Sequence, residues 1–339
     1  MGNRNASPPP VDDYLVPSNS LPTVKRRIGN CQNLSLILAR YIPESVIMDR
    51  GSGKGDWLKR QARALGGDVL NKLAAAYYQR WLATTQGSQR FTGTLQSRMI
   101  VGLGGKNPLE IGITLAYITG LPIIPGSALK GLARAYGLLH LADHMTQTVK
   151  VASIADNAEL LETLDTFLVA EDRFHKDLLE DKAINALALH FKLKTETVAE
   201  GLDELKEANH YRRAFGSQKY AGVCAFHDAV PVGLQQRPFE VDVMTPHFVK
   251  YYNSANSNDR PDTAPHDGDN PKPVNFLTVA RRTTFAFAVG LRRVVAADEN
   301  AIAAQAVAVE WLKKGLDELG VGAKTASGYG VFEKFKDMQ

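Results

Sequence analysis

The sequence contains few cysteines, and it has no long apolar run. Its two cysteines, Cys31 and Cys224, form no disulfide framework and match no zinc-ligand spacing. A reducing cytoplasm therefore fits best. No run of 18 apolar residues occurs, so no membrane span is expected. The first five residues carry no apolar segment, which argues against a secretory signal at this end.

A strong excess of charge of either sign is also missing. Lysine and arginine number 40 against 36 aspartates and glutamates, which gives a net charge of +4. A domain that grips bare nucleic acid alone is usually more basic. A subunit that shares one RNA with neighbouring proteins needs fewer positive charges, and so does an enzyme with an anionic substrate. Charge alone leaves these classes open.

Two segments about 190 residues apart combine glycines with a lysine beside a helix end. Residues 121–134 read LPIIPGSALKGLAR, and residues 320–330 read GVGAKTASGYG. Glycine lets the backbone approach a ligand closely and adopt positive φ angles. Amides at a helix start attract anions, and phosphate is the commonest biological anion of suitable shape. The pair of segments therefore indicates a phosphate-rich partner, such as a polynucleotide.

Each segment also has a purely structural interpretation. In the first, Ser127 is expected to cap a helix on which Lys130 and Arg134 share a face, since they are four residues apart. That face either contacts phosphate or is simply solvated. The second segment lacks the Walker A spacing. Its amides form an anion nest, or its glycines only join a helix to a strand.

Four motifs, in order along residues 91–332, resemble the RAMP superfamily, the RNA-binding subunits of CRISPR effector complexes. Within it, the nearest resemblance is to the sixth-subunit family of type III-B (Cmr) complexes. The motifs are PGSALKG with Arg134, Phe215-Gly216-Ser217 with Asp228, Asp242 with Thr245-Pro246-His247, and the terminal glycine-rich segment. Ala128 stands where the superfamily often has serine. Asp228 is expected to be structural, holding a loop through side-chain to backbone hydrogen bonds.

The resemblance implies an α+β, ferredoxin-like or RRM-like RAMP fold with a large helical insertion. We predict an extended or disordered arm over residues 1–30, which contain a proline-rich stretch. A single domain is expected over residues 31–339, with the insertion at about 145–210. Residues 253–273, rich in Asn, Asp, Pro and Gly, predict a mobile loop.

Hydrophobic periodicity places the main elements. Helices are predicted at residues 56–81, 127 to about 145, and 301–319, the last ending at Gly320. Strands are predicted at residues 91–103, 111–117, 223–226, 239–243, 283–291 and 331–332. Residues 34–41 are compatible with either a helix or a strand.

The sequence thus favours a non-catalytic subunit that binds guide RNA near its 3′ end, with paired target RNA and other RAMP subunits as partners. The predicted RNA-binding residues are Gly126, Ser127, Lys130, Arg134, Lys324, Thr325, Ser327 and Tyr329. No catalytic residue, metal or other cofactor is expected. Two alternatives remain: a guide-processing endoribonuclease with His247 as base and Lys324 as charge stabiliser, or a connector that contacts only protein.

Overall fold

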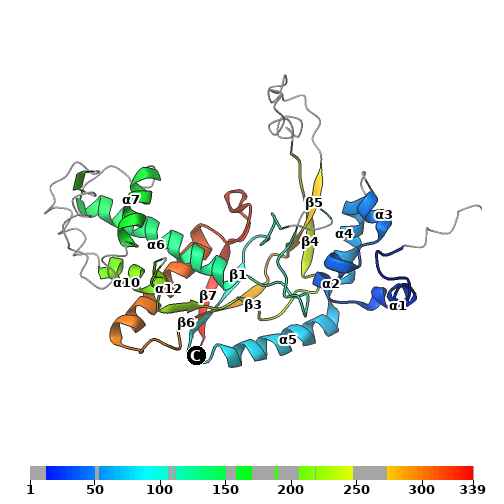
Figure 1. The fold of residues 1–339 in the computed structure, drawn as a ribbon, viewed down its shortest axis with the longest axis horizontal. Coiled ribbons are helices and arrows are strands. Elements are labelled where there is room, and N and C mark those ends of the chain that lie inside the picture. Colours follow the sequence, from blue (N-terminus) through cyan, green and yellow to red (C-terminus); the bar gives the residue numbers. More distant parts are fainter. Residues whose placement is uncertain are drawn as a thin grey trace, which may run out of the picture. The chain divides into compact units, whose positions relative to one another are not determined.

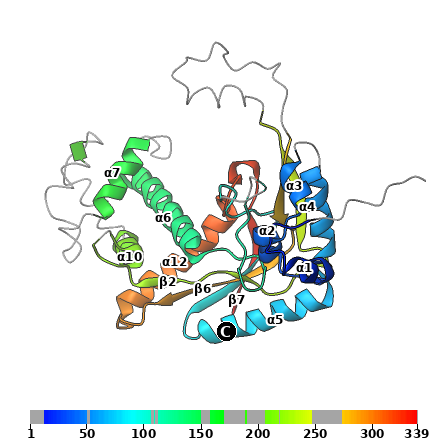
Figure 2. The same cartoon turned by 45° about the vertical axis from the view of Figure 1, so that its right-hand side comes forward.

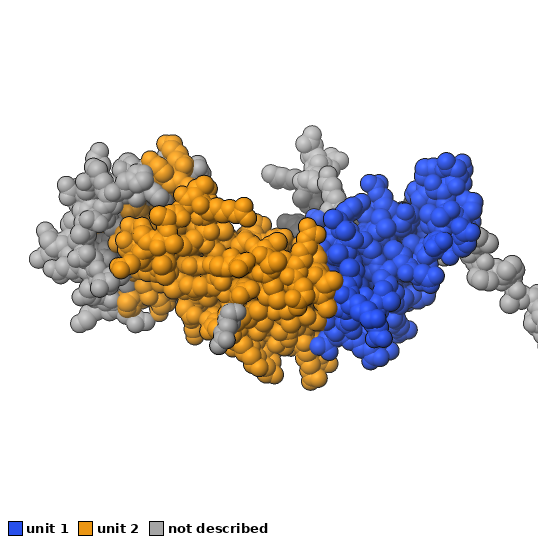
Figure 3. Space-filling model, turned by 90° about the horizontal axis from the view of Figure 1, so that it is seen from below, with its two compact units in different colours: residues 1–74, 102–122, 234–280 blue, residues 75–101, 123–233, 281–339 orange. Residues whose placement is uncertain are grey.

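The computed structural model describes residues 13–49, 53–105, 109, 112–149, 158–169, 188–189, 206–217, 219–246 and 273–338. The chain divides into two compact units (Figure 3). Unit 1 comprises Met1–Ala74, Gly102–Pro122 and Leu234–Ala280, and unit 2 comprises Ala75–Val101, Ile123–Gly233 and Arg281–Gln339. This division differs from the expected single domain. Two internal segments of the chain are grouped with the N-terminal helices and not with the sheet of unit 2.

Unit 2 is built on a five-stranded antiparallel sheet (Figure 1). Its strands are β1 (Gln89–Leu95), β2 (Cys224–Phe226), β3 (Val230–Pro231), β6 (Thr284–Leu291) and β7 (Phe332–Met338). The order is β2–β6–β1–β7, and β3 continues the edge beside β6. Helix α6 (Gly126–Val149) follows β1, and α12 (Glu299–Glu318) joins β6 to β7. This is the βαββαβ connectivity of a ferredoxin-like fold, and the α+β prediction is confirmed.

Alternation along β6 explains how the sheet is covered on both faces. Phe285 and Phe287 lie on one face and are fully buried. Phe91 of β1 stacks on Phe287 with 4.9 Å between ring centroids, and Lys313 of α12 lies over Phe91. The phenylalanine face is therefore the one that α12 covers. Large side chains here supply most of the apolar area that the sheet buries.

The opposite face of β6 carries small residues at the alternate positions. Ala286 and Ala288 pack in a buried cluster with Trp81, which comes from helix α5 (Gly67–Thr84). The indole nitrogen of Trp81 also donates a 2.8 Å hydrogen bond to the carbonyl oxygen of Asp228. Small side chains leave room for α5 to approach the sheet. This part of the sheet therefore presents no open aromatic platform of the kind on which RRM domains stack bases.

Helices α6 and α12 lie side by side over the sheet (Figure 2). Helices α7 (Ala158–Leu168) and α10 (Lys206–Phe215) pack against them. Helix α12 begins where Asp298 accepts a 2.7 Å hydrogen bond from the Ala301 amide. It ends before Gly320, whose φ of 74° confirms the predicted C-terminal stop. The described parts of the predicted insertion are helical.

Unit 1 combines helices with a two-stranded hairpin. Its elements are α1 (Leu21–Arg27), the 3-10 turn η1 (Ile28–Asn30), α2 (Leu34–Arg40), α3 (Glu44–Met48), α4 (Gly53–Ala64), β4 (Phe239–Met244) and β5 (Val274–Val279). Helix α4 packs on the hairpin, and a buried cluster including Leu34, Trp57, Phe239 and Leu277 joins them. Helix α5 begins in unit 1 and ends in unit 2.

Several sequence-based predictions differ from the structure. The predicted helix over residues 56–81 is two helices, because the backbone turns at Gly66 and Gly67 with φ of 138° and 77°. Residues 21–30 of the predicted arm are helical. Within described residues 112–120, the predicted strand is reduced to an isolated bridge between Leu115 and Pro122. Strand β5 was not predicted. The predicted mobile loop lies, apart from Pro273, outside the described residues.

Candidate nucleic-acid interface

The first residue of α6 is fixed by a hydrogen bond to a side chain from the segment after β2. The amide of Gly126 donates a 2.7 Å hydrogen bond to Oδ1 of Asp228. A Cβ at Gly126 would lie 2.1 Å from the carbonyl oxygen of Phe226, so only glycine fits at this contact. The structural role predicted for Asp228 is confirmed. The prediction that Ser127 caps the helix is wrong, because Ser127 lies exposed within the first turn and the cap comes from Asp228.

Lys130 lies one turn further along α6, among other positive charges. Burial lowers the pKa of its half-buried ammonium group, and the charges of Arg134 and Arg292 lower it further, against the influence of Cys224. The cations of α6 and of the segment after β6 thus act on one another. A bound anion would relieve this repulsion, so the electrostatics of Lys130 are compatible with a phosphate contact.

Arg134 has a carboxylate partner within the fold. Its Nη2 lies 2.6 Å from Oδ1 and 2.7 Å from Oδ2 of Asp165, on α7. The hydroxyl of Tyr211, on α10, donates to the same carboxylate at 3.2 Å. Arg134 therefore ties three helices together. Part of the positive charge that the sequence places on this face of α6 is balanced inside the protein.

The terminal glycine-rich loop is held by backbone hydrogen bonds, both within the loop and to residues 98–100. The amides of Ala323 and Gly330 each donate at 2.8 Å to carbonyl oxygens of residues 98–100. The amide of Val321 donates to Gly330 at 3.0 Å. A Cβ at Gly330 would lie 2.0 Å from the Val321 carbonyl oxygen, and φ is 73° there. These three amides serve the fold. The predicted contacts of the loop with a ligand also include side chains.

Those side chains surround a short 3-10 turn, η4 (Thr325–Ser327). Ser327 is exposed, and Thr325 is half-buried. Lys324 adopts a left-handed backbone conformation with φ of 62°. The Arg98 guanidinium lies 5.7 Å from the ring centroid of Tyr329, within the range of a cation–π contact. Arg98 therefore adds a positive charge beside the aromatic ring, which sequence reasoning did not identify.

The two predicted groups occupy different parts of unit 2. The terminal loop precedes β7. At this end of the sheet, Phe332 of β7 pairs with Leu95 of β1, and the neighbouring residue of β1 pairs with Thr284 at the start of β6. The start of α6 contacts the Phe226–Asp228 segment, where His227 donates its amide to Ala288 further along β6. The structure thus places Lys130 and Arg134 together on α6. It places the other predicted group, Lys324, Thr325, Ser327 and Tyr329, together in the terminal loop.

The acid–base candidate His247 lies outside the described residues. Among the residues that the structure does describe, no group of three His, Cys, Asp or Glu side chains is placed to hold a metal ion. None of the described helices is both long and apolar enough to span a membrane.

A model of the RAMP superfamily matches residues 92–333, a range that begins within β1, contains β2, β3 and β6 and ends within β7. The chain belongs to the RAMP superfamily. The predicted family is therefore confirmed.

The chain is also similar to individual proteins. The CRISPR system Cmr subunit Cmr6 of Pyrococcus furiosus is 33% identical over 274 residues, which cover 76% of this chain and 72% of that protein. A crystal structure of Cmr6 from Pyrococcus furiosus gives 29% identity and a TM-score of 0.40 over 73% of this chain and 97% of that chain. A type III-B Cmr-beta structure bound to cognate target RNA contains a chain with 18% identity and a TM-score of 0.48, over 85% and 75%.

Proposed function

We propose that this RAMP protein is a non-catalytic, RNA-binding subunit of a type III-B CRISPR effector complex. The 33% identity to Cmr6 over three quarters of the chain carries the proposal. Its partners are guide RNA, paired target RNA and neighbouring RAMP subunits in the cytoplasm. Within the complex it caps the backbone filament and holds the 3′ portion of the guide.

The contacts are made to the sugar-phosphate backbone. Lys130 supplies a positive charge from α6, and Lys324, Thr325, Ser327 and Tyr329 supply a charge, two hydroxyls and a ring from the terminal loop. Gly126 and Ser127 bring the first turn of α6 close to the RNA strand. Arg134 donates hydrogen bonds to phosphate through the guanidinium N–H groups that Asp165 does not occupy. Phosphate contacts position a strand without reading its sequence. Such binding suits a subunit that must accept any guide sequence.

An experiment on the assembled complex tests this proposal. Complexes containing the wild-type chain or Lys130→Gln/Lys324→Gln are purified with two guides of unrelated sequence, and bound guide is quantified at increasing salt. We expect the double variant to lose guide at lower salt, to the same extent for both guides. Normal retention by the double variant, or a loss confined to one guide, contradicts the proposal.

The absence of catalysis has its own test. Wild-type chain and His247→Ala are incubated separately with labelled repeat RNA and labelled target RNA. We expect neither protein to cut either RNA. Cleavage by the wild type that the variant loses would replace this proposal with the guide-processing nuclease.

A further inference from the structure

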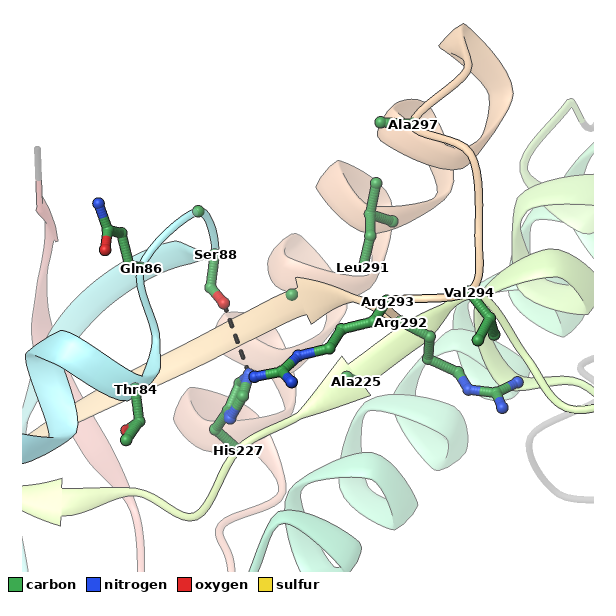
Figure 4. Close-up of a pocket in the computed structure, with 12 residues that line it drawn as sticks. Thr84, Gln86, Ser88, Ala225, His227, Leu291, Arg292, Arg293, Val294 and Ala297 are labelled. Carbon is green, nitrogen blue, oxygen red and sulfur yellow. Dashed lines mark hydrogen bonds between the residues drawn. The ribbon is translucent and has the colours of Figure 1, made fainter.

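A cavity of about 580 Å³ opens at the Leu291 end of β6 (Figure 4). All of its lining residues belong to unit 2. They come from the turn between α5 and β1, from β2 with the residue after it, and from the end of β6 with the following turn. None of the predicted RNA-binding residues lies among them. Its volume is in the range of small-ligand sites.

The lining is basic. Arg292 and Arg293 follow β6 directly, and their guanidinium groups diverge along the wall (Figure 4). His227 also lines the cavity, and among the described residues that line it there is no Asp or Glu. The nearby carboxylate of Asp228 accepts the Gly126 amide at the start of α6. The cavity thus differs from the surroundings of Arg134, where a carboxylate balances the guanidinium.

Two polar atoms in the lining of the cavity lie close to one another. The Oγ of Ser88 and Nε2 of His227 lie 3.5 Å apart, long for a hydrogen bond. A Cβ at position 290 would lie 2.6 Å from Ser88 Oγ and 3.3 Å from His227 Nε2. Gly290 therefore keeps this corner open. Both atoms remain within reach of a hydroxyl group of a ligand.

The ionisation state of His227 fits this role. Burial lowers the pKa of its imidazole, although the charge of Asp228 opposes the shift. Near neutral pH the ring is uncharged, with one nitrogen that donates and one that accepts a hydrogen bond. A neutral imidazole beside a serine hydroxyl matches a ribose hydroxyl, which is both donor and acceptor. A guanidinium matches a phosphate, which it can bind through two parallel hydrogen bonds.

The cavity also adjoins the proposed RNA contact on α6. Arg292 acts electrostatically on Lys130, and its Nη1 lies 3.5 Å from the carbonyl oxygen of Gly222, which precedes β2. Positive charge therefore continues from α6 across the edge of the sheet to the cavity. We infer that this cavity binds one ribonucleotide unit of an RNA strand, with its phosphate on Arg293 and its ribose 2′-hydroxyl on Ser88 and His227. The inference rests on the proposed RNA-binding function and extends it to a second site.

The test uses the full chain and fluorescein-labelled rU12, followed by fluorescence anisotropy at several salt concentrations. Arg293→Gln is expected to weaken binding about tenfold, the size of one charge-assisted contact, and to flatten the salt slope by about 1. Lys314→Gln, at an exposed position on α12, removes the same charge outside the cavity and should bind like the wild type. Ser88→Ala should reduce the preference for rU12 over dU12. Unfolding midpoints confirm that each variant is folded.

Two outcomes overturn the inference. One is wild-type affinity of Arg293→Gln while Lys130→Gln/Lys324→Gln loses RNA, which leaves the proposed function intact. The other is an equal loss from Arg293→Gln and Lys314→Gln, which would indicate an effect of net charge alone.

A chain that binds no rU12 would contradict the proposed function and not, by itself, the cavity. In that case uridine 3′-monophosphate is added to the protein labelled at histidine, and NMR spectra are recorded. Shifts of the His227 ring signals that uridine does not produce, and that Arg293→Gln abolishes, support the cavity. Unchanged His227 signals reject it. RNA hexamers ending in a 3′-phosphate or a 3′-hydroxyl then distinguish an end from an internal nucleotide.

Discussion

Arg134 and the pair Arg292–Arg293 belong to the same unit but differ in the charges around them. Arg134 faces the carboxylate of Asp165, and Tyr211 completes that contact. The arginine pair lines a cavity that no described Asp or Glu lines. Arg134, a basic residue within a family motif, therefore stabilises the fold through an ion pair. Arg292 and Arg293, which lie outside every motif, line a cavity that can receive an anion. Substitution of Arg134 should mainly change the free energy of unfolding. Substitution of an arginine of the pair should mainly change the affinity for RNA.

The largest stability effect is expected in the terminal loop. Gly330→Val places a side chain against the Val321 carbonyl oxygen, 2.0 Å from the new Cβ, at a positive φ. We expect the free energy of unfolding to fall by about 2–4 kcal/mol. Gly328→Ala is the matched control, since its φ is 81° but its Cβ meets open space, and it should cost about 1 kcal/mol. Urea unfolding measures both, and equal losses would show that packing at Gly330 is unimportant.

The second effect concerns the ion pair on the helical layer. Arg134→Ala and Asp165→Ala should each lower the free energy of unfolding by about 1 kcal/mol, because both groups are partly exposed. The double variant should lose less than the sum of the two, since the contact is shared. A double-mutant cycle gives the coupling. A coupling of zero would mean that Arg134 is not used by the fold.

The third effect separates RNA contacts from stability. Lys130→Gln and Lys324→Gln should each flatten the salt dependence of RNA binding by about 1, near one phosphate contact apiece. Their unfolding free energies should stay within about 0.5 kcal/mol of wild type. Arg134→Gln should have the smaller influence on RNA, because Asp165 occupies part of its guanidinium. Equal RNA effects from Lys130→Gln and Arg134→Gln would remove this distinction.

The smallest effect is a dependence of stability on pH. The folded pKa of His227 lies below the 6.5 of an unperturbed histidine, so the unfolded chain binds more protons between the two values. The contribution of His227 should therefore lower the free energy of unfolding as the pH falls from about 6.5 toward the folded pKa. Above pH 6.5 the ring is neutral in both states, so this contribution does not change with pH. The charge of Asp228 acts on this imidazole, and Arg292 and Arg293 line the same cavity. His227→Gln should show a flatter decline between pH 7.5 and 5.5, and parallel declines would contradict this assignment.

Much of the unit 2 sheet could be predicted from the sequence, because its signals are local. The alternation of large and small apolar residues gave β6 almost to the residue, and the glycine after α12 fixed the end of that helix. The two-helix break at Gly66 was missed because apolar spacing continues across it. Strand β5 was missed because its last four residues are all buried, so buried and exposed positions do not alternate along it.

The site was only partly predictable from the sequence. The motifs located Lys130 and the terminal loop, but nothing in them shows that Asp165 pairs with Arg134 or that Asp228 caps α6. Both partners lie at least 31 residues away in sequence. The cavity joins residues from three distant segments. Its one local signal, the Arg292-Arg293 doublet directly after a predicted strand, was visible in the sequence.

The central claim is that this RAMP protein holds guide RNA through backbone contacts in unit 2. The most direct measurement is a cross-link map in the assembled effector complex, made with guides that carry 4-thiouridine at successive positions near the 3′ end. We expect cross-links to peptides containing Lys130 and residues 324–329, at the same guide positions for two guides of unrelated sequence. A complex that contains intact guide yet gives no cross-link to unit 2 would contradict it.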